Sequence, residues 1–152
     1  MTLLLHLHPR MISATDRPAL PGIARRIAVA VYDGLLVLAV MFAAAFPFIL
    51  ILGGATEAPL RHVFQAYLFC VLAAYFVWFW THGGQTLAMK TWRVRLVVIP
   101  RGDVSTVTAI SRFVLACAGL AFFGAGWWWM LFDREGLTLH DRLTGTRLIK
   151  IE

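Results

Sequence analysis

A chain of 152 residues that is 60% hydrophobic and 14% charged is not an ordinary soluble domain, because soluble domains are about 45–50% apolar and about 25% charged. A fold of this size could not bury so much apolar surface, so lipid must solvate part of it. The net charge of +6 would suit nucleic acid, but the basic residues flank apolar runs. That arrangement instead indicates contact with anionic lipid headgroups, and we expect no nucleic-acid partner.

The chain begins with a polar segment that contains three prolines and a short apolar run within residues 1–22. The run is too short for the core of a signal peptide. We therefore expect residues 1–22 to form a flexible N-terminal tail and residues 23–152 to form one membrane domain.

Three apolar runs follow, and each is long enough to be a membrane-spanning helix. The first, residues 27–52, would span about 39 Å as a helix, against a hydrocarbon core of about 30 Å. The second, residues 62–80, ends in tryptophans, which favour the headgroup layer. The third, residues 109–132, carries Arg112 at its start, where a long side chain can reach the interface. The sequence predicts an all-α membrane protein with about three transmembrane helices.

Basic residues are unevenly distributed among the segments that connect these runs. They precede the first run and recur in residues 81–112, whereas the loop 53–61 contains only Arg61. By the positive-inside rule, the N-terminus and residues 81–112 are cytoplasmic. We therefore expect a multi-pass protein of the bacterial inner membrane whose N-terminus is cytoplasmic.

Two short segments have the character of β-strands, residues 92–99 in the cytoplasmic loop and residues 146–151 near the C-terminus. Each is the natural partner of the other, since a short strand is not stable alone. If they pair, the third run must turn back as a re-entrant hairpin around Gly119, Gly124 and Gly126 instead of crossing. Three full crossings are the favoured interpretation, and the hairpin is the alternative, so the side of the C-terminus stays open.

Asp33 is the main candidate for function, because it lies inside the first apolar run. A carboxylate in hydrocarbon is costly, so such a residue usually faces protein or water and has a partner. Arg26, seven positions earlier, lies on the same helix face and could be bridged to Asp33 by a water. Alternatively, Asp33 pairs with a group of another element. The sequence allows either a structural lock or a titrating, cation-binding site.

His140 and Asp141 form a second polar group near the C-terminus. Asp141 either accepts backbone N–H bonds in a local turn or reaches Arg93 or Arg95 to close a cytoplasmic cap. His140 titrates near neutral pH and is a secondary candidate for sensing it.

Arg26 and Asp33 in a first transmembrane helix resemble the opening of the RDD family of bacterial membrane proteins, which is named for one arginine and two aspartates. The resemblance continues in three short motifs, Gly84-Gln85-Thr86-Leu87, Leu139-His140-Asp141 and Thr144-Gly145-Thr146-Arg147. It implies that the family's arginine is Arg26, that its first aspartate is Asp33 and that its second is Asp141.

This resemblance covers nearly the whole chain and implies that residues 23–152 form an RDD-like membrane domain. Ala88 and Arg93 depart from the pattern, since the family often has glycine at these positions. Some members are associated with sodium/proton exchange. The resemblance therefore implies transport of a small cation or other ligand through an intramembrane Asp–Arg site, and the alternative is a non-transporting structural or accessory subunit.

Motifs for nucleophilic, nucleotide-dependent or metal-dependent catalysis are missing from the sequence. Cys70 and Cys117 lie inside apolar runs, and we interpret them as small apolar packing residues. We expect no enzymatic activity, no metal and no cofactor. Three helices enclose little volume, so a transport pathway would require a homo-oligomer or a partner membrane protein.

Overall fold

The computed structural model describes residues 20–53, 57–100 and 102–151. The predicted N-terminal tail therefore lies, except for residues 20–22, outside the described residues.

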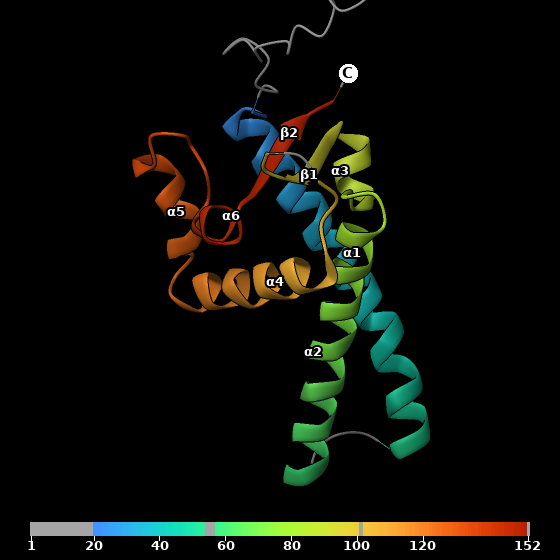
Figure 1. Ribbon diagram of the computed structural model, residues 1–152. Coiled ribbons are helices and arrows are strands. Elements are labelled where there is room, and N and C mark those ends of the chain that lie inside the picture. The colour runs from blue at the N-terminus through green and yellow to red at the C-terminus, as the bar shows by residue number, and fades with distance from the viewer. Residues whose placement is uncertain (1–19, 54–56, 101, 152) are drawn as a thin grey trace, which may run out of the picture.

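Two long helices, α1 (Ile23–Leu52) and α2 (Ala58–Thr81), form an antiparallel hairpin (Figure 1). Helix α1 ends at Gly53, whose φ of 72° is the left-handed conformation that terminates many helices. Helix α2 begins with a proline in its first turn, where the missing N–H has no cost. Both helices begin four residues earlier than the predicted 27–52 and 62–80.

A small sheet joins the two predicted strand segments. Strand β1 (Val94–Val98) follows the short helix α3 (Leu87–Thr91), and β2 (Thr146–Lys150) follows the short helix α6 (Leu139–Thr144). The strands pair antiparallel, with Leu96 opposite Leu148. The predicted pairing is confirmed, and it joins the strand that precedes the third apolar run to the strand that follows it.

The third run is not the single helix over 109–132 that hydropathy predicts. It forms α4 (Thr106–Ala121) and α5 (Ala125–Phe132), which are bent by 94°. The break contains two residues with positive φ, Phe123 at 53° and Gly124 at 74°. Figure 1 shows α4 extending sideways from α2, with its N-terminal end at α2, and α5 turning upward from its far end. This bend is the geometry that the re-entrant alternative requires.

The fold class is nevertheless the predicted one, a mostly helical membrane protein with a small sheet. Within the described residues, two helices are long and apolar enough to cross a membrane, and the bent pair is a third candidate when it is counted as one span.

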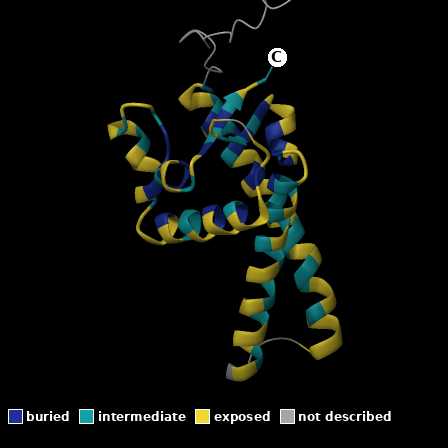
Figure 2. Ribbon diagram, viewed as in Figure 1, coloured by how far each residue is buried: buried dark blue, intermediate teal, exposed yellow. Residues whose placement is uncertain are grey.

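The packed core lies at the sheet end of the molecule (Figure 2). Its buried apolar residues are Val29, Trp80, Ala88, Met89, Val94, Leu96, Val104, Ala109, Phe113 and Leu148. The far halves of α1 and α2 instead expose large apolar side chains, such as Phe42 at 71% and Ile51 at 79%. Exposed apolar surface of this extent indicates that lipid or another membrane helix covers it.

Close contact between the backbones of α4 and α5 holds the bent pair together. A Cβ atom on Gly119 would lie 3.1 Å from Gly126 Cα. We expect Gly119→Val to lower the free energy of unfolding by about 1–3 kcal/mol, since neither backbone can move aside easily. Thermal unfolding in detergent measures this. The matched control is Gly34→Val, because a Cβ atom there meets nothing within 4 Å. Equal stability losses in the two variants would contradict the prediction.

Candidate functional site

One face of α1 carries the charged residues that the sequence singles out. Arg26, Val29 and Asp33 are buried on this face, with 5%, 5% and 6% exposure. The prediction that Arg26 and Asp33 share a helix face is therefore right. Among the described residues, however, the two form neither a hydrogen bond nor an ion pair with each other. Each side chain instead reaches a different element, Arg26 the connection after α5 and Asp33 the start of α3.

Arg26 binds backbone carbonyl groups. Its Nε donates to Pro21 O at 3.0 Å, and its Nη1 donates to Gly136 O at 2.6 Å. Gly136 lies in the connection between α5 and α6, with a φ of 63°. Arg26 thus ties the start of α1 to a segment more than a hundred residues later, which is a structural role.

Asp33 accepts hydrogen bonds from hydroxyl groups. Thr86 Oγ1 donates to Asp33 Oδ2 at 2.8 Å, and Tyr75 Oη lies 3.5 Å from Asp33 Oδ1, a long contact. No Lys, Arg or His side chain among the described residues lies within 4.0 Å of the Asp33 carboxylate. The alternative prediction, in which Asp33 pairs with a group of another element, is the one that the structure supports.

The Gly-Gln-Thr motif positions this partner. Thr86 caps α3 by accepting from Met89 N at 3.2 Å, which fixes the hydroxyl that donates to Asp33. Gln85 Nε2 donates to Val94 O at 2.7 Å. Gly84 has a φ of 71°, and a Cβ atom there would lie 2.4 Å from Leu96 O. The position therefore requires glycine, for both its backbone conformation and its close approach to β1.

Asp141 forms a buried ion pair with Arg112. Arg112 Nη2 donates to Asp141 Oδ1 at 2.6 Å, and the two side chains are 5% and 1% exposed. Thr138 and Thr146 donate to the same carboxylate at 2.7 and 3.0 Å. The guanidinium of Arg112 lies 4.6 Å from the ring centroid of Trp80, close enough for a cation–π contact.

Three predictions for this region are wrong. Arg112 does not extend outward from the helix, because it is buried and turns inward to Asp141. Neither Arg93 nor Arg95 reaches Asp141, since Arg95 pairs with the exposed Asp103 at 3.2 Å and Arg93 lies in an open pocket. The side chain of Asp141 accepts from hydroxyl groups and Arg112, not from the backbone N–H groups of a local turn.

The charged state of Asp141 is well stabilised. Burial alone would raise the pKa of Asp141, but the charge of Arg112, the proximity of His140 and the two threonine hydroxyl groups together lower it. Asp141 is therefore a carboxylate at neutral pH, neutralised by Arg112. The ion pair joins α4 to α6, and the hydrogen bond from Thr146 adds β2.

His140 is buried beside this pair as a neutral ring. The single hydroxyl proton of Thr138 goes to Asp141, so His140 Nε2, 3.0 Å from the same oxygen, must be the donor. His140 Nδ1 then carries a lone pair and has no hydrogen-bond partner in the described part of the chain. Burial, and then the charge of Arg112, lower the pKa of His140 to about 4, although Asp141 acts in the opposite direction.

Sequence reasoning missed Arg112 as the partner of Asp141 and missed the hydroxyl groups that surround both aspartates. The signal for Arg112 was present, because a buried arginine in an apolar run is as costly as Asp33 and equally needs a partner. Thr138 was also detectable, since a threonine three residues before an acid at a helix start is a capping pattern.

Comparison with family models gives a match over residues 20–145 to the model described as the RDD family. The matched segment includes Arg26, Asp33 and Asp141. Comparisons with curated proteins and with solved structures gave no match.

Proposed function

Because the chain belongs to the RDD family, we propose that it is a transport-related protein of the bacterial inner membrane in which Asp33 binds and releases a proton or a small cation. One observation carries this proposal. Asp33 is 6% exposed on a membrane-spanning helix and lies among hydroxyl groups, with no basic side chain against it in the described residues.

The two buried aspartates differ in how their charge is compensated. Asp141 has Arg112, whereas Asp33 has Thr86 and the more distant Tyr75. An uncompensated buried charge is costly, so Asp33 gains stability when a proton or cation neutralises it. The oxygen atoms of Asp33, Thr86 and Tyr75 are hard ligands, which suit an alkali cation better than a transition metal.

The proposal includes an oligomer or a partner membrane protein and a cytoplasmic N-terminus, and it involves no enzymatic step. A hairpin and a bent helix pair enclose little space for a pathway. The exposed apolar surfaces of α1 and α2 support association with further membrane helices. The basic residues near the start of α1 support the orientation.

Proteoliposomes with an imposed Na⁺ gradient and an internal pH-sensitive dye test this proposal. We expect the wild type to couple the Na⁺ gradient to a change in internal pH, and Asp33→Asn to reduce the rate at least about tenfold, since a neutral amide cannot exchange a charge. Asp33→Glu keeps the carboxyl group and should retain part of the rate. The matched control is Asp103→Asn, which neutralises an acid whose side chain is 87% exposed.

A structural or accessory role is the second candidate, because Arg26 and Asp141 both act as ties between elements. It predicts no Na⁺-dependent pH change for any variant, together with a loss of thermal stability in Asp33→Asn. A flux that survives Asp33→Asn unchanged would contradict the transport mechanism.

A further inference from the structure

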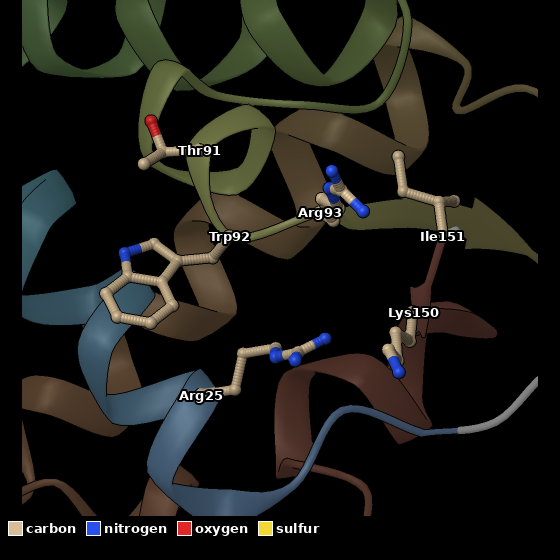
Figure 3. Close-up of a pocket in the computed structure, with 6 residues that line it drawn as sticks. All are labelled: Arg25, Thr91, Trp92, Arg93, Lys150 and Ile151. Carbon is tan, nitrogen blue, oxygen red and sulfur yellow. The ribbon is translucent and has the colours of Figure 1, made fainter.

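A basic pocket lies beside the first turn of α1, at the sheet end of the molecule. Its volume is about 440 Å³, and its lining residues are Arg25, Thr91, Trp92, Arg93, Lys150 and Ile151. Figure 3 shows Arg25, Arg93 and Lys150 approaching the pocket from three separate segments, which are α1, the connection between α3 and β1, and the end of β2. Segments far apart in the sequence thus bring positive charges together.

These charges have no counterion among the described residues. The ion pairs that the described residues form involve Arg95, Arg112, Arg142 and Arg147, and none includes a basic residue of the pocket. Arg93 also has a φ of 53°, a left-handed conformation that a non-glycine residue rarely adopts. Three neighbouring positive charges that no described acid neutralises attract an anion.

An apolar groove adjoins the basic pocket. It has a volume of about 520 Å³ and is lined by Trp92 and by the α1 residues Ala24, Ile27, Ala28, Val31, Tyr32 and Leu35. Trp92 belongs to both hollows. The groove extends about 16 Å along α1, on the face opposite the buried Arg26 and Asp33.

We propose that the pocket and the groove together form one binding site for an anionic phospholipid. The phosphate would contact Arg25, Arg93 and Lys150, and an acyl chain would lie along α1. The order of the two parts fits a bilayer, because the basic pocket is at the start of a membrane-spanning helix and the apolar groove continues along that helix. The indole of Trp92 lies where the two parts meet, as tryptophans do at the headgroup layer.

Native mass spectrometry of the full chain in detergent, with palmitoyl-oleoyl phosphatidylglycerol or phosphatidylcholine added, tests the site. We expect the protein to retain phosphatidylglycerol, and Arg25→Gln and Lys150→Gln each to weaken that binding about fivefold. Retention of phosphatidylcholine should not change. Arg25→Lys keeps the charge and should bind as the wild type does, which separates loss of charge from loss of fold.

Arg61→Gln is the matched control, because it removes a positive charge at the opposite end of the α1–α2 hairpin. If Arg61→Gln weakens phosphatidylglycerol binding as much as Arg25→Gln, binding is non-specific and the proposal is wrong.

Two further measurements distinguish a lipid from a soluble phosphate compound. Ala28→Phe fills the groove and should weaken phosphatidylglycerol binding while all three basic residues remain. Inorganic phosphate should displace the lipid only weakly, since it cannot use the groove. Unchanged lipid binding in Ala28→Phe, or displacement by phosphate at concentrations equal to those of the lipid, would overturn the assignment to a phospholipid.

Discussion

Arg112→Leu is expected to lower the free energy of unfolding by about 3–5 kcal/mol, because it leaves the Asp141 carboxylate buried without its cation. Leucine replaces much of the apolar stem of the arginine, so the loss reports mainly on charge. The Asp141 side chain is 1% exposed, and water cannot take over the role of the guanidinium. Thermal unfolding of the detergent-solubilised protein at neutral pH measures the effect.

An exposed ion pair supplies the control. Arg95→Leu breaks the pair with Asp103, whose side chains are 40% and 87% exposed, and should cost less than about 1 kcal/mol. Adding Asp141→Asn to Arg112→Leu should restore part of the lost stability, since the double variant no longer buries an unpaired charge. If Arg112→Leu costs no more than Arg95→Leu, the buried pair does not hold the fold.

The sequence predicted those features that depend on local pattern. The length of the apolar runs identified α1 and α2, and the alternation of apolar and basic residues identified both strands and their pairing. The break in the third run was harder to predict, because it depends on positive φ angles at Phe123 and Gly124, to which hydropathy is insensitive. The glycines around the break were the available cue.

The sequence did not predict which residues form hydrogen bonds with Arg26 and Asp33. Spacing correctly placed Arg26 and Asp33 on one face of α1, but their partners come from residues far along the chain, Gly136 and Thr86. These contacts depend on how the short helices pack against α1. The periodicity of residues within one helix does not predict that packing.

The alternation of side chains along β1 excludes Arg95 as the partner of Asp141. Val94 and Leu96 are buried on β1, so the side chain between them must lie on the opposite face of the strand. Arg95 accordingly pairs with Asp103 outside the core, and a residue of α4 supplies the cation for Asp141. The alternation that predicted the strand also determined which of its residues could face inward.

The buried His140 should make stability fall as the pH falls from about 6.5 to about 4. In the unfolded chain, His140 takes up a proton near its ordinary pKa of 6.5, whereas in the folded protein its pKa is about 4. Between these values the unfolded state binds a proton that the folded state does not, so acid favours unfolding. The loss approaches about 3 kcal/mol and is absent above pH 6.5. Thermal unfolding in detergent across this range measures it.

His140→Gln isolates this contribution, because glutamine is neutral throughout the range and its amide can still donate to Thr138. The difference in stability between wild type and His140→Gln should therefore shrink or reverse as the pH falls below 6.5. His62→Gln, at the far end of the α1–α2 hairpin, should leave the profile of the wild type unchanged. Below pH 4 both proteins should lose further stability as Asp141, whose folded pKa is lowered, takes up a proton. Parallel profiles for wild type and His140→Gln between pH 6.5 and 4 would mean that His140 is protonated beside Arg112 in the folded protein. That result would contradict the burial of the ring and the lack, within the described residues, of a hydrogen-bond partner for Nδ1.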